Sequence, residues 1–145
     1  MSSATMTTEN TFKFALVSPE RILMSEDIKM VTVPGDDGDF GVLPNHAPLL
    51  SSLRDGIAVI LRADGTEEKV FVSGGFADVN DNVCTSLAED AAALSDLDRA
   101  ALEAEREKTS EHLKMVDEEE HDDLIKRTRL VRKLERIETK LALIA

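Results

Sequence analysis

Apolar and polar residues alternate in short runs over the first two thirds of the chain, which is the pattern of strands in a β-sheet. Glycine, proline, asparagine and aspartate separate the runs, as expected for tight turns. The expected strands are 12–17, 22–24, 28–33, 40–43, 49–53, 57–62, 68–72, 76–79 and 83–87. This spacing predicts a β-sandwich or flattened barrel of nine or ten strands, and we adopt ten. Because strands and helices do not alternate, a nucleotide-binding parallel sheet is not expected.

The apolar period changes at Ala88 from two to about 3.6, the period of a helix. A first helix is expected from Asp96, as its N-cap, to about Val116, and a second from about Leu124 to Ile144. The expected apolar face of the first helix is poor in large side chains and comprises Leu97, Ala100, Ala101, Ala104 and Met115. The apolar face of the second comprises Leu130, Val131, Leu134, Ile137, Leu141 and Ile144. Pairing of these faces predicts an antiparallel hairpin. Because Ala buries little area, the closed hairpin is expected to be only modestly stable and its closure to be reversible.

The predicted fold class is therefore β + α, with an N-terminal ten-stranded β-sandwich or flattened barrel followed by a C-terminal antiparallel two-helix hairpin. The expected divisions are a disordered arm at 1–11, the sandwich at 12–90 and the hairpin at 91–145. No run approaches the roughly 20 apolar residues that cross a bilayer, so the chain itself is not expected to span a membrane. The first residues also lack the basic and apolar segments of a secretory signal.

Charge is distributed unevenly along the chain. The formal net charge is −12, yet residues 124–145 hold seven Lys or Arg and two Glu, so the remainder carries −17. An acidic body repels nucleic acid, and no aromatic residue interleaves with the basic tail to stack on bases, so no nucleic-acid partner is expected. The basic residues of the second helix form one arc: Lys126, Arg129, Arg132, Lys133, Arg136 and Lys140. Two interpretations stay open, pairing with an acidic row on the first helix (Glu103, Glu107 and Glu111) or binding of a larger acidic partner.

The sequence shows no arrangement of catalytic residues. His46 lies in a Pro-Asn-His-Ala-Pro segment, without a Ser or Cys nucleophile at a known spacing. The three histidines also lack the spacing of metal ligands. Cys84 falls within an alternating strand, so a packed and unreactive thiol is expected there. The chain is therefore not expected to be an enzyme, and no cofactor is expected to be required.

The segment from Gly38 to Leu50 reads GDFGVLPNHAPLL and is followed by FVSGGF at 71–76 and a charged helical pair. These features resemble the epsilon subunit of bacterial F-type, proton-translocating ATP synthases, over roughly residues 12–145. The resemblance implies a non-catalytic subunit of the rotating central stalk, which couples rotation of the c-ring to ATP synthesis. It also implies a hairpin that extends along the gamma subunit and inhibits ATP hydrolysis. The implied location is the cytoplasmic face of the bacterial inner membrane, reached only through the complex.

The same resemblance implies where partners bind. The residues concerned are Gly38, Asp39, Phe40, His46, Arg129, Lys133 and Lys140. Asp39 matches the acidic position that contacts the c-ring, and His46 lies in the segment that matches the gamma-facing loop. The basic second helix matches the part of the family that meets an acidic loop of a catalytic beta subunit within the alpha/beta assembly.

Some members of that family bind regulatory ATP through a motif of Ile or Leu, Asp, two variable residues, Arg and Ala. Residues 95–100 read SDLDRA, so Asp, Arg and Ala are present while Ser replaces the apolar residue. The ATP-binding residues implied by this match are Asp96, Arg99, Ala100, Arg132 and Arg136. Paired arginines one helical turn apart suit phosphate oxygens. The alternative is that Asp96 only caps the first helix and Arg99 lies on its surface.

A rival function of another class also fits these residues, namely a ligand-binding β-sandwich with a coiled-coil adaptor tail. A small ligand bound by residues 1–90 in the absence of gamma would favour the rival. Assembly with gamma would favour the stalk subunit.

Overall fold

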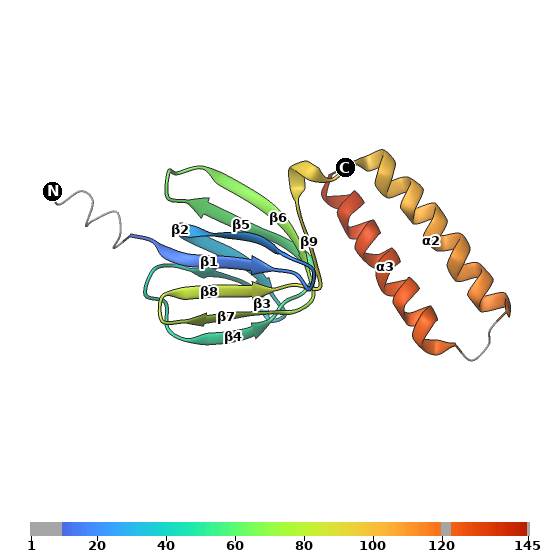
Figure 1. Cartoon of the computed structure of the whole chain (residues 1–145), viewed down its shortest axis with the longest axis horizontal. Coiled ribbons are helices and arrows are strands. Elements are labelled where there is room, and N and C mark those ends of the chain that lie inside the picture. The colour runs from blue at the N-terminus through green and yellow to red at the C-terminus, as the bar shows by residue number, and fades with distance from the viewer. Residues whose placement is uncertain (1–9, 120–122, 145) are drawn as a thin grey trace. The chain divides into compact units, whose positions relative to one another are not determined.

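The computed structural model describes residues 10–119 and 123–144, and the chain divides into two compact units between Ala93 and Leu94 (Figure 1). The first unit is built of strands and the second of helices. Most of the expected N-terminal arm lies outside the described residues. None of the helices in the described ranges is long and apolar enough to cross a membrane.

The first unit contains nine strands among its described residues. They are β1 (Phe12–Val17), β2 (Ile22–Gly35), β3 (Gly38–Val42), β4 (Leu49–Ser52), β5 (Gly56–Arg62), β6 (Glu67–Ser73), β7 (Phe76–Asn80), β8 (Val83–Leu87) and β9 (Asp90–Ala93). They follow the order β4-β7-β8-β1-β2-β5-β6-β9, and β3 pairs with β2. Only the β1–β8 pair is parallel among these described strands.

The long strand β2 joins the two layers of the sandwich (Figure 1). Its first half pairs with β1, from Ile22 to Ile28, and its second half lies between β3 and β5. Alternate side chains of both layers point inward and are fully buried, including Phe14, Leu16, Ile28, Val31 and Ile60. Each large side chain removed from water in this way contributes about 1.5–3 kcal/mol, so the β-sandwich holds together through its own core. The predicted sandwich is confirmed.

Two details of the predicted strands were wrong. The polar run Ser25–Asp27 does not end a strand, because all three residues continue the ladder with β1 and make one strand of the two expected at 22–24 and 28–33. Strand β9 was missed, because its three alanines favour helix, whereas pairing with β6 holds them extended. The described strands therefore number nine rather than ten, and strand structure continues to Ala93, three residues beyond the expected boundary at 90.

The second unit contains a short 3-10 turn, η1 (Leu94–Asp96), and two helices, α2 (Arg99–Glu119) and α3 (Leu124–Leu143). The helices are antiparallel, since Arg99 at the start of α2 bonds to the carbonyl of Ile144, and Arg127 in the first turn of α3 pairs with Asp117. The predicted helical hairpin is confirmed. The predicted N-cap was wrong by two residues, because Asp98 rather than Asp96 accepts the N–H of Ala100, at 3.2 Å.

The two helices differ in how well their apolar faces were predicted. In α3, Leu130, Ile137 and Leu141 are buried, as expected. The expected face of the first helix was wrong at four of its five members, because Ala100, Ala101, Ala104 and Met115 are exposed, whereas Leu97 packs against the buried cluster as expected. The buried residues of α2 are instead Leu102, Thr109 and Val116, which recur every seven residues as in a coiled-coil seam. Packing selects the larger Leu and Val over the neighbouring alanines, because they bury more area.

Candidate partner-binding surfaces

The tip of the β2–β3 hairpin carries three exposed aspartates. Gly35 pairs with Gly38, and Asp36 and Asp37 form the turn between them. Gly38 has φ +129°, a conformation that side chains rarely adopt, so glycine is required there. Asp39 forms an ion pair with Arg54, and Phe40 is half-buried. The structure thus places the predicted segment Gly38, Asp39 and Phe40 on one exposed hairpin.

His46 lies in a fixed loop between β3 and β4. Its N–H donates to the carbonyl of Leu43 at 3.1 Å, and its ring Nδ1 lies 2.6 Å from the carbonyl oxygen of Ala47. The N–H of Asn45, a residue with φ +67°, donates to the Asn82 side chain at 2.7 Å. These bonds hold the loop in place and leave Leu43 exposed beside it.

An exposed apolar face covers the outer side of the layer formed by β4, β7, β8, β1 and the first half of β2. Its large members are Ile22, Leu50, Phe76, Val83 and Leu87. Leu50 is 68% exposed and Phe76 is 43% exposed. Phe76 lies in register with Leu87, and Leu87 with Val17, which pairs with Ile22, so one row of apolar side chains crosses four strands. Sequence reasoning missed this outer apolar face, although the apolar residues at outward positions of predicted strands were a signal for it.

The basic arc on α3 is only partly neutralised by α2. Lys133 pairs with Glu105 at 3.8 Å, whereas Arg129 is exposed and makes no ion pair with a described residue. The expected acidic row does not pair with the arc, because Glu103 bonds to Arg99 of its own helix, at 3.5 Å. Neither of the other two row members, Glu107 and Glu111, forms an ion pair within the described ranges. The cross-helix pairs use Glu105 and Asp117 instead.

The residues expected to bind ATP do not converge in the hairpin. Arg99 bonds to the carbonyl of Ile144, which lies twelve residues beyond Arg132, or about 18 Å along the helix axis. Arg132 and Arg136 are one turn apart on α3, and Arg132 also lies 3.6 Å from Glu135. Asp96 is in the 3-10 turn, and the N–H of Ala100 is taken by Asp98. The arrangement places the arginine pair and Arg99 at different levels of the hairpin.

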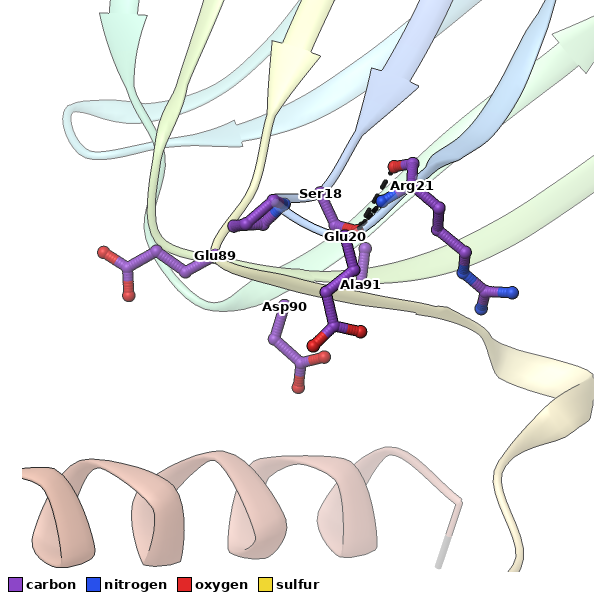
Figure 2. A pocket seen from close by; sticks show the side chains of 7 residues that line it. Ser18, Glu20, Arg21, Glu89, Asp90 and Ala91 are labelled. Atoms are coloured by element: carbon purple, nitrogen blue, oxygen red, sulfur yellow. Dashed lines mark hydrogen bonds between the residues drawn. The ribbon is translucent and has the colours of Figure 1, made fainter.

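Figure 2 shows a small polar pocket at the β1–β2 turn, lined by Ser18, Pro19, Glu20, Arg21, Glu89, Asp90 and Ala91. Its volume is about 190 Å³, below the range of about 300–1,000 Å³ typical of small-molecule sites. The Ser18 hydroxyl donates to the carbonyl of Arg21 at 3.2 Å, so it serves its own turn. The described residues contain no group of three His, Cys, Asp or Glu side chains that would hold a metal ion. The pocket therefore gives no support to the rival function of a ligand-binding sandwich.

Cys84 is fully buried in the core of the sandwich. Burial raises the pKa of the Cys84 thiol to about 11, because the thiolate would lose its hydration there. The thiol therefore stays protonated at neutral pH and is shielded from solvent, which agrees with the packed thiol expected from the sequence.

Comparison with known proteins gives a consistent result. Residues 11–94 match the family described as ATP synthase, Delta/Epsilon chain, beta-sandwich domain. The chain is 46% identical over 104 residues to the ATP synthase epsilon chain of Rhodospirillum rubrum, covering 72% of this chain and 78% of that one. It is 44% identical over 110 residues to the ATP synthase epsilon chain of Maricaulis maris, covering 76% and 82%.

Two solved structures share the fold. A chain in the Euglena gracilis mitochondrial ATP synthase, OSCP/F1/c-ring, matches with a TM-score of 0.70 at 23% identity, covering 94% of this chain and 82% of that one. A chain in the Tetrahymena thermophila mitochondrial ATP synthase, central stalk/c-ring, matches with a TM-score of 0.53 at 14% identity, covering 89% and 95%. Both likenesses extend beyond the sandwich into the helical unit, because each covers more of the chain than the 93 residues of the first unit.

Proposed function

The chain belongs to the family of ATP synthase epsilon chains, and on that premise we propose that it is a non-catalytic subunit of the central stalk that couples rotation of the c-ring to ATP synthesis. The observation that carries the proposal is the family match over the whole β-sandwich, at residues 11–94. In this role the subunit is a peripheral protein at the cytoplasmic face of the bacterial inner membrane, held there by the complex. Its sandwich transmits force by rigid contact, because strand β2 joins the two layers and their inward side chains are packed between them.

The gamma subunit is the proposed partner of the outer apolar face and of the loop that carries His46. Large apolar side chains on the surface of a sheet mark protein interfaces, and aromatic residues such as Phe76 are frequent anchors. The face lies on an acidic body, and only two of the described positions paired directly with its apolar members are charged, Lys13 in register with Val83 and Asp78 in register with Leu50. Most of its contact with a partner therefore rests on apolar burial. Asp39, on the β2–β3 hairpin, is the proposed contact to the c-ring.

The basic arc of α3 is the proposed inhibitory element. Residues 124–145 carry a net +5, and Arg129 of the arc is exposed without an ion pair to a described residue, so the helix offers positive charge to an acidic partner. If the hairpin opens, the arc becomes available to an acidic loop of a catalytic beta subunit. Contact between this arc and the catalytic assembly would resist rotation in the direction of hydrolysis.

Replacement of Phe76 by Glu is expected to weaken binding of the chain to gamma at least about tenfold, because a charge would be buried where the largest side chain of the apolar face meets its partner. The measurement is the dissociation constant of purified chain and gamma by calorimetry. Ala63→Glu is the matched control, because it adds the same charge at an exposed turn between β5 and β6. Wild-type protein that fails to bind gamma would overturn the proposed function. Equal binding by Phe76→Glu would remove only the assigned face.

A further inference from the structure

Arg54 ties the acidic hairpin tip to the strand segment beside it. Its Nη1 donates to the carbonyl oxygen of Gly35, and its Nη2 donates to Oδ1 of Asp39. One guanidinium therefore spans the two strands of the hairpin, β2 through a backbone oxygen and β3 through a carboxylate. The planar fork of arginine can bond two acceptors at once in fixed directions, whereas lysine acts as a point charge.

Backbone bonds place Arg54 where this contact is possible. The N–H of Arg54 donates to the carbonyl of Pro34 at 2.9 Å, and the N–H of Asp36 donates to the carbonyl of Ser52 at 2.9 Å. Leu53 forms a bridge with Gly35 between these two bonds. The segment that carries Arg54 therefore runs beside the hairpin and holds the backbone at the base of the hairpin in place. The Arg54 side chain is then left to hold Asp39.

The ion pair is poorly placed to serve the stability of the fold. The side chain of Arg54 is 45% exposed and that of Asp39 is 58% exposed. Ion pairs this open to water contribute little to stability. What the contact does change is the freedom of the Asp39 carboxylate, because one of its oxygens is held by Arg54 while the exposed side chain still has acceptor sites for a partner.

We propose that Arg54 is a positioning residue that presents Asp39, on the β2–β3 hairpin, to a basic loop of the c-ring. This inference rests on the proposed function and names the chemistry of the contact. A carboxylate held in one orientation accepts a charge-assisted hydrogen bond from Lys or Arg at a smaller entropic cost than a free one. Asp36 and Asp37, exposed at the turn beside it, add to the negative field that attracts such a loop.

Positioning by Arg54 and attraction by charge alone predict opposite changes in affinity when Arg54 is replaced. Removal of the Arg54 charge makes the tip more negative, so a partner that reads charge alone would bind Arg54→Met more tightly. If Arg54 positions Asp39, the same substitution weakens binding although the tip has become more attractive to a cation. Arg54→Lys keeps the charge and loses the fork, so an intermediate loss is expected.

The test is the affinity of the full-length chain, in complex with gamma, for the detergent-solubilised c-ring. Arg54→Met is expected to weaken binding about 3- to 10-fold, and Asp39→Asn at least as much. The double variant is expected to bind no worse than Asp39→Asn alone, because the two residues act as one unit. Arg62→Met is the matched control, since it removes another ion-paired arginine, bonded to Glu26 and Glu68, from the same sandwich.

The outcomes distinguish the inference from the function on which it rests. If Asp39→Asn weakens binding but Arg54→Met binds as well as wild type or better, positioning is wrong and the ring contact stands. If Asp39→Asn has no effect, the proposed ring contact itself is wrong. The midpoint of thermal unfolding of Arg54→Met is expected to change by less than about 4 °C, and a larger change, not shared by Arg54→Lys, would assign Arg54 to the fold.

Discussion

Removal of residues 94–145 is expected to raise the rate of ATP hydrolysis by the assembled complex about threefold or more, without loss of assembly. The reason is that truncation removes the basic arc of α3 while the core of the sandwich, whose buried residues lie between Phe12 and Ala88, remains intact. The cut follows Ala93, so β9 keeps its pairing with β6. The measurement is the ATPase rate of complexes assembled with the full chain and with residues 1–93.

The position of the truncation decides whether the sandwich keeps strand β9. A chain that ends at Glu89 also lacks the helical unit, but it leaves the edge of β6 unpaired next to the buried Val70 and Val72. This shorter chain is expected to unfold at a lower temperature than residues 1–93. An unchanged hydrolysis rate with residues 1–93 would show that the hairpin does not inhibit, and would leave the proposed stalk role standing.

Replacement of Ile137 by Ala is expected to destabilise the closed hairpin by about 2–4 kcal/mol. Ile137 is 2% exposed in a seam to which the described side chains of α2 contribute three buried residues, so few other contacts compensate for its loss. Such a change shifts the ratio of closed to open hairpin by about 30- to 700-fold. The expected results are faster hydrogen exchange throughout α2 and α3 in the isolated chain, and stronger inhibition of hydrolysis in the complex.

A substitution in the same seam is expected to stabilise the closed hairpin instead. Thr109 is 3% exposed between Leu102 and Val116, so Thr109→Val replaces a buried hydroxyl by a methyl group and is expected to stabilise the closed hairpin by about 1 kcal/mol. Slower exchange and weaker inhibition are expected. Met115→Ala is the control, because Met115 is 53% exposed and its truncation should leave exchange nearly unchanged. If Ile137→Ala, Thr109→Val, Met115→Ala and the wild type all show the same hydrogen exchange, the seam does not control opening of the hairpin.

The local patterns of the chain were sufficient for most of its elements. Alternation located eight of the nine described strands, because neighbours on one strand reveal which face is buried. It failed for β9, where three alanines carry no alternation and only the edge of β6 dictates an extended backbone. It also failed at Ser25–Asp27, where a polar stretch stays in the ladder because β1 pairs along its whole length.

The candidate surfaces were harder to predict, because they depend on residues that are distant in sequence. The Arg54–Asp39 contact joins positions fifteen residues apart, and nothing in the local pattern of either indicates the other. The buried face of α2 was also misjudged, since Ala101 and Leu102 are neighbours and only the packing of α3 decides which of them faces the seam. The basic arc of α3, in contrast, was predictable, because helical geometry alone brings its residues together.

The most direct measurement of coupling is ATP-driven proton pumping by vesicles that contain the ATP synthase assembled without this chain. The proposed role predicts hydrolysis with little pumping in its absence, and recovery of the protons moved per ATP when either the full chain or residues 1–93 are added back. Full pumping per ATP in vesicles that lack the chain would contradict the role of a coupling subunit.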